Sequence, residues 1–82
     1  MITIIYFWAE HQQVYSDDEQ YIIGTNCKAM GIKEEQFKTY KELENFIEDL
    51  TITEAESEGH EEFKILAIFD KETGWYDNRY VK

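Results

Sequence analysis

The fold of this chain is decided by Phe63–Phe69, which has the sequence FKILAIF. This segment is apolar on both of its alternating faces, as expected for a central strand that is covered on both sides. It is followed by Asp70–Gly74, where Gly74 can supply the positive φ of a tight turn, and then by Trp75–Val81, which predicts a returning strand. The C-terminal part of the chain is therefore predicted to be a β-hairpin with Phe63–Phe69 at the centre of the sheet.

Two more elements have clear local signals. Ile2–Trp8 is apolar on both faces and predicts a third strand. A helix is predicted from Thr39, because Thr39 and Glu42 have the spacing of a capping box and an apolar stripe continues to Leu50. Thr51–Glu62 is then predicted as a loop with at most one helical turn.

The segment between Ser16 and Gly31 has two interpretations. Ser16–Glu19 has the pattern of a helix start, and Gly31 that of a helix end, which predicts a helix with Cys27 on its buried side and without a metal. The alternative is a hairpin of Val14–Tyr15 with Tyr21–Ile23, because the Gly-Thr-Asn sequence after Ile23 is a poor helix interior. The helix is the preferred prediction.

These elements predict one α+β domain over residues 1–82. The expected order is strand, helix, helix, strand, strand, which gives a small three-stranded sheet with a C-terminal β-hairpin and two helices on one face. The two helices would form a crossover that places Ile2–Trp8 parallel to Phe63–Phe69. Aromatic residues make up 16% of the chain, which excludes a wholly disordered protein.

Charge is distributed very unevenly along the chain. The formal net charge is −10, and Glu42–Glu62 contains nine of the 18 acidic residues and none of the eight basic ones. Within the predicted helix Glu44 and Glu48 repel each other at a spacing of four residues, so helix stability does not explain this pattern. The candidate partner-binding residues are Glu42, Glu44, Glu48, Asp49, Glu54, Glu56, Glu58, Glu61 and Glu62. An acidic surface repels nucleic acid and anionic membranes, so the predicted partner is a basic protein surface.

Metal, cofactor and catalytic signatures are weak, and no catalytic, metal-binding or cofactor-binding residue is predicted. Cys27, His11 and His60 lack the close pairing of zinc ligands, and Asp70–Asp77 lacks the spacing of a calcium-binding loop. A histidine beside a glutamate is more often exposed than catalytic. The single cysteine, and the absence of an apolar span or a signal-peptide pattern before or within Ile2–Ala9, predict a cytoplasmic protein.

The favoured hypothesis is a non-enzymatic protein whose carboxylates occupy a nucleic-acid-binding surface of a partner. In physical profile such a chain resembles the small acidic inhibitors that phages and mobile elements direct against restriction, CRISPR or repair enzymes, and also nuclease immunity proteins and antitoxins. The alternative is a small homo-oligomeric adaptor, for example a homodimer, that associates through an aromatic sheet face. In that case the acids serve only solubility. Trp75, Tyr76 and Tyr80 are the candidate residues of that secondary interface.

Overall fold

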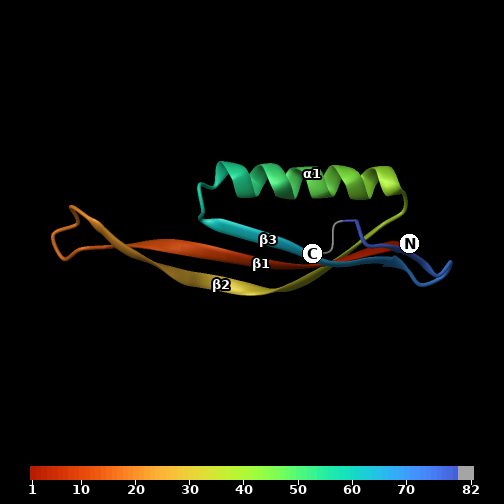
Figure 1. Ribbon diagram of the computed structural model, residues 1–82, viewed down its shortest axis with the longest axis horizontal. Coiled ribbons are helices and arrows are strands. Elements are labelled where there is room, and N and C mark those ends of the chain that lie inside the picture. The colour runs from red at the N-terminus through yellow and green to blue at the C-terminus, as the bar shows by residue number, and fades with distance from the viewer. Residues whose placement is uncertain (80–82) are drawn as a thin grey trace.

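The computed structural model describes residues 1–79 and consists of one four-stranded sheet and one helix (Figure 1). The elements are β1 (Ile2–Tyr15), β2 (Ile22–Phe37), α1 (Tyr40–Glu56), β3 (Glu61–Asp70) and β4 (Trp75–Asp77). The strands lie in the order β2-β1-β3-β4, and every neighbouring pair is antiparallel. The predicted three-stranded sheet with two helices on one face is therefore wrong, because a fourth strand replaces the first predicted helix.

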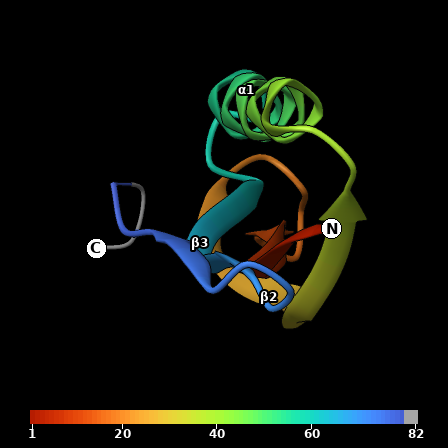
Figure 2. The same cartoon turned by 90° about the vertical axis from the view of Figure 1, so that its right-hand side faces the viewer.

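The molecule has two layers over most of its length. α1 lies across one face of the sheet, and no other element within residues 1–79 covers the opposite face (Figure 1). Figure 2 shows the same arrangement end-on, with α1 on one side of the twisted sheet only. The overall dimensions are 57 × 19 × 19 Å, since the β1–β2 hairpin extends well beyond the end of α1 (Figure 1).

β2 occupies most of the segment that was predicted as the first helix. It pairs with β1 along its whole length, from Ile2 opposite Phe37 to Tyr15 opposite Ile22. The alternative hairpin is therefore the correct interpretation, and it is much longer than its sequence signal suggested. Helix propensity is a weak preference, and the continuous pairing with β1 overrides it.

The apparent capping box at Ser16–Glu19 forms the turn of this hairpin instead of a helix end. The backbone N–H of Ser16 donates to the carbonyl of Tyr21 at 2.8 Å, and the Ser16 hydroxyl donates to the Asp18 carboxylate. The hydrogen bonds from Ser16 and from the backbone N–H of Gln20 lower the pKa of Asp18. Serine and aspartate side chains bind backbone groups in turns as well as at helix ends, so the pattern alone does not separate the two.

Phe63–Phe69 is a strand, as predicted, and lies within β3 between β1 and β4. Its pairing with β1 is antiparallel, whereas the sequence predicted a parallel crossover. The reason is topological: α1 carries the chain back along the sheet after β2, so β3 runs in the direction of β2 and against β1. The predicted turn at Asp70–Gly74 is confirmed, since Gly74 has φ 73° and Asp70 lies opposite Trp75.

α1 begins as predicted but ends later. Thr39 Oγ1 accepts a hydrogen bond from the backbone N–H of Glu42 at 3.2 Å, and the Glu42 carboxylate accepts one from the backbone N–H of Lys38 at 3.2 Å. The helix continues through Glu56, so the first part of the predicted Thr51–Glu62 loop is helical. No helix within residues 1–79 has the length and apolar character needed to cross a membrane.

The core lies between α1 and one face of the sheet. It is formed by Ile4 and Tyr6 of β1, Leu43 and Ile47 of α1, and Ile68 of β3. Ile4, Leu43 and Ile68 are fully buried. Burying an aliphatic side chain of this size contributes about 1.5–3 kcal/mol, so this cluster is what holds α1 on the sheet.

Candidate functional site

The acidic segment predicted to bind a partner forms the outer side of α1 and the turn that follows it. Glu44, Glu48, Asp49 and Glu56 are exposed on α1, and Glu58 is exposed in the turn before β3. Glu44 and Glu48 are separated by about one helical turn and Asp49 and Glu56 by about two, so the carboxylates form two rows along α1. We call these five residues the acidic exterior.

The other four predicted residues do not belong to this surface. Glu42 caps the start of α1. The half-buried Glu54 points toward the sheet, where its carboxylate accepts a hydrogen bond from the backbone N–H of Phe63 at 2.7 Å. Glu61 is half-buried at the start of β3, and Glu62 is exposed beside it. The sequence run is therefore divided by the fold into a surface set and a structural set.

The charges of the acidic exterior are not neutralised within the described chain. The ion pairs formed among residues 1–79 involve Glu62, Asp70, Glu72 and Asp77, none of which lies on α1. Lys41 is the one base on α1, and the last turn of the helix has none. Carboxylates there face the negative end of the helix dipole, which costs typically about 0.3–1 kcal/mol each.

The outer side of α1 has about half the charge density of a nucleic-acid strand. The helix has 17 residues, which span about 26 Å at about 1.5 Å per residue. Its four outward carboxylates (Glu44, Glu48, Asp49 and Glu56) give one per ~6.5 Å of axis. A single strand of B-DNA has one phosphate per ~3.4 Å. The helix therefore presents a line of negative charge on a rigid rod, at roughly half the linear charge density of a single strand.

The aromatic residues of the predicted secondary interface do not form one surface. Trp75 packs against α1, with its ring centroid 5.7 Å from that of Tyr40. Tyr76, the next residue of the strand, faces the opposite side of the sheet and is 59% exposed. Tyr80 lies outside the described residues. Of the two that the structure describes, Tyr76 is the one on the uncovered face.

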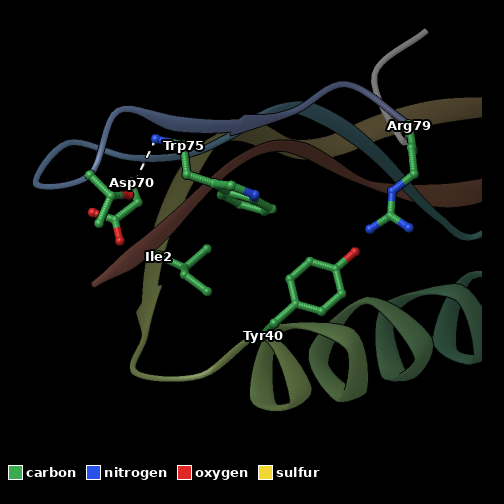
Figure 3. A pocket seen from close by; sticks show the side chains of 6 residues that line it. Ile2, Tyr40, Asp70, Trp75 and Arg79 are labelled. Atoms are coloured by element: carbon green, nitrogen blue, oxygen red, sulfur yellow. Dashed lines mark hydrogen bonds between the residues drawn. The ribbon is translucent and has the colours of Figure 1, made fainter.

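An open hollow of about 420 Å³ lies between the start of α1 and β4 (Figure 3). Its lining residues are Ile2, Tyr40, Asp70, Thr73, Trp75 and Arg79. Tyr40, Trp75 and Ile2 converge on it from the helix and from two strands (Figure 3). No histidine, cysteine or lysine is among these lining residues.

Asp77 is a buried carboxylate near this hollow that no sequence pattern singled out. It accepts hydrogen bonds from the Tyr40 hydroxyl at 3.0 Å and from Nε and Nη2 of Arg79 at 3.0 and 2.6 Å. The backbone N–H of Arg79 also donates to it at 2.9 Å. The spacing Asp77-Asn78-Arg79 is the signal that could have indicated this turn. The network joins the start of α1 to β4, which is a structural role.

The residues weighed for metal binding and catalysis lie in ordinary structural environments. Cys27 is exposed on β2, so its predicted burial on a helix is wrong, and the reason is that its segment forms an edge strand. Nε2 of His11 lies 3.6 Å from the Glu62 carboxylate. Within residues 1–79 no group of three or more histidine, cysteine, aspartate or glutamate side chains has an arrangement that could hold a metal ion.

Comparison of the chain with protein-family models, with curated proteins and with solved structures gives no match.

Proposed function

We propose that this protein is a non-enzymatic inhibitor that binds a basic, nucleic-acid-binding surface of a partner protein through the acidic exterior of α1. The observation that carries the proposal is the row arrangement of Glu44, Glu48, Asp49 and Glu56, exposed and without ion pairs within the described residues. The partner supplies the missing positive charges.

The stability of the fold gives no reason for these acids. Glu44 and Glu48 repel each other at a cost of about 0.2–0.5 kcal/mol, and Glu56 lies at the unfavourable end of the helix dipole. Glu42 and Glu54, in contrast, accept backbone hydrogen bonds that the fold uses. The acidic exterior thus weakens the helix slightly, which is expected of residues retained for binding and not for folding.

The charge density of α1 indicates the kind of partner. Enzymes that bind DNA or RNA line their grooves with lysine and arginine, because affinity for the phosphate backbone is mainly electrostatic. A helix with an outward carboxylate about every 6.5 Å can occupy such a groove and exclude the nucleic acid. Long-range attraction between opposite charges also accelerates encounter.

This chemistry fits inhibitors of restriction, CRISPR or repair enzymes encoded by phages and mobile elements, and also immunity proteins that neutralise a nuclease. We accordingly place the protein in the cytoplasm, in a complex with a basic enzyme and without a cofactor of its own.

The proposal is tested by affinity capture from a lysate at low and high salt, followed by titration of the captured partner. We expect wild-type affinity to fall steeply as salt increases, since screening removes the attraction between exposed charges. The variant Glu48→Lys with Glu56→Lys should bind about tenfold more weakly or worse, mainly through a slower association rate. Its circular dichroism should remain that of the wild type.

A matched control is Asp17→Lys with Glu72→Lys, which changes the net charge equally at exposed positions away from α1. The control should bind almost as well as the wild type. The proposal is wrong if both double variants lose the same affinity, or if the α1 variant binds as tightly as the wild type. In that case the acids serve solubility, and the homo-oligomeric adaptor becomes the better hypothesis.

A further inference from the structure

The face of the sheet opposite α1 carries a continuous apolar band. Ile5 and Phe7 alternate with the buried Ile4 and Tyr6 along β1, so they point away from α1. The strand pairing places further apolar residues beside them on β2, β3 and β4. The band consists of Met30, Ile32, Ile5, Phe7, Phe69 and Tyr76, and we call it the bare face.

Parts of the bare face are unusually exposed for apolar side chains. Ile32 is 69% exposed, Met30 61% and Tyr76 59%. None of the three touches α1, and no other element within residues 1–79 lies over this side of the sheet (Figure 1). Contiguous apolar surface of this kind on a soluble domain marks an interaction site.

The bare face has the footprint of a small interface. Thr3–Ala9 of β1 spans about 23 Å at about 3.3 Å per residue, and β2, β1 and β3 at about 4.8 Å apart are about 14 Å wide, which gives ~330 Å². The three residues of β4 add ~50 Å² opposite Thr3 and Ile4. This projected area is roughly half of the ~800 Å² that each partner of a standard interface buries, which corresponds to a small, reversible contact.

Charge identifies the occupant. The acidic exterior lies on the other side of the molecule, whereas the bare face has mixed charges at its margins, with Glu34 on one side and Lys64 beside Glu62 on the other. The Glu62 carboxylate lies 3.6 Å from Nε2 of His11. A basic partner is drawn to α1 and not to this nearly neutral side. Two copies of this chain joined through their bare faces hold their acidic helices apart by two sheets, about 30 Å, which exceeds the Debye length of about 8 Å at physiological salt.

The positions of these charges are also self-complementary. Two adjacent rows cross the sheet: Ile32, Phe7 and Lys64 form one, and Glu34, Ile5 and Ala67 form the next. The apolar diagonal thus runs from Ile32 to Ala67, while Glu34 and Lys64 occupy the two remaining corners.

We propose that the bare face binds a second copy of this chain, with the twofold axis lying along the apolar diagonal. This axis maps the band onto itself and exchanges the two charged corners, so Glu34 of each copy lies opposite Lys64 of the other. The strands of the two sheets then cross at a steep angle, which is one of the two established modes of sheet-on-sheet packing. The dimer presents α1 on both outer sides, so each copy keeps its acidic exterior accessible.

Sedimentation velocity and light scattering over about 1–100 μM test this proposal directly. The wild type should be a dimer that persists in high salt, because apolar burial dominates the contact. Ile32→Glu should be monomeric over the same range. The matched control is Ile23→Glu, which adds the same charge to the same strand at a residue that is 66% exposed but lies near the hairpin tip. It should remain dimeric.

The orientation is tested by a charge exchange. Glu34→Lys and Lys64→Glu should each raise the dimer dissociation constant about tenfold or more, and the double variant should return to within about threefold of the wild type. A monomeric wild type at 100 μM overturns the dimer, as does equal behaviour of Ile32→Glu and Ile23→Glu. Single variants that weaken the dimer without rescue in the double variant overturn the proposed axis. Partner binding through α1 is measured separately, with the Ile32→Glu variant. The dimer proposal can therefore fail without affecting the test of the proposed function.

Discussion

The two faces of the same sheet differ in what covers them, although their sequences are similar. On β1, Ile4 and Tyr6 are buried beneath α1, whereas Ile5 and Phe7, one position along, remain partly exposed. Both sets are apolar and alternate in the same strand. The difference teaches that the large apolar side chains of a strand become fully buried where a second layer lies on them, and here one helix can cover only one side. On the uncovered side of β1 the buried residues are the smaller Thr3 and Ala9.

The largest expected effect is the difference in stability between a variant of the covered face and a variant of the bare face. Leu43→Ala removes a fully buried side chain from the core beneath α1 and should lower the free energy of unfolding by about 2–5 kcal/mol. Ile32→Ala on the bare face should change it by about 0.5 kcal/mol or less in the monomer. Chemical denaturation at low protein concentration measures both without a contribution from self-association. Equal losses in the two variants would show that the bare face belongs to the monomer's core.

An intermediate effect on stability is expected for variants on the two sides of α1. Glu54→Ala leaves the backbone N–H of Phe63 without its acceptor and should cost about 1–3 kcal/mol. Glu48→Ala on the outer side removes a repulsion with Glu44 and should leave stability unchanged or raise it by about 0.2–0.5 kcal/mol. Both are glutamate-to-alanine changes within one helix, so their helix propensities cancel. Thermal unfolding measures the stability of both variants. A larger loss of stability in Glu48→Ala than in Glu54→Ala would contradict this division of the acids.

The smallest effect appears at alkaline pH. Burial, and secondarily the nearby charge of Glu35, raise the pKa of Tyr6 in the folded state. The stability that this proton provides is complete below the unfolded pKa of about 10 and is lost as pH rises through the higher folded value. Tyr6→Phe should therefore show a shallower decline of unfolding free energy above pH ~10 than the wild type. A decline above pH ~10 that is as steep in Tyr6→Phe as in the wild type would contradict this assignment.

Local signals were sufficient for three parts of the fold. Phe63–Phe69 is apolar on both faces over a short length, Gly74 ends a turn, and Thr39 with Glu42 caps a helix. Each depends on residues close together in the chain, so the sequence contains the whole interaction. The helix predicted for Ser16–Gly31 was wrong for the complementary reason. Its turn and helix signals are equally compatible with its residues, and the partner that decides between them is β1.

Which of the acidic side chains face solvent could be predicted only in part. The concentration of acidic charge in Glu42–Glu62 is a property of sequence alone, and the amphipathic pattern of α1 was enough to direct part of it outward. The roles of Glu54 and Asp77 were not predictable in the same way. Glu54 binds a strand nine residues further on, and Asp77 accepts from Tyr40, which is 37 residues away.

The sequence by itself determined the net charge, its concentration in one segment, the capped helix and the C-terminal turn. The tertiary structure decided that residues 22–37 form an edge strand, that Cys27 is exposed, and that the bare face is left without a cover. The physical reason is that alternation along a strand states which side chains share a face but not what lies against that face. What covers a face depends on the helices available to pack on the sheet. Because residues 22–37 form β2 and not a second helix, α1 is left to cover one face, and within residues 1–79 no second helix covers the other.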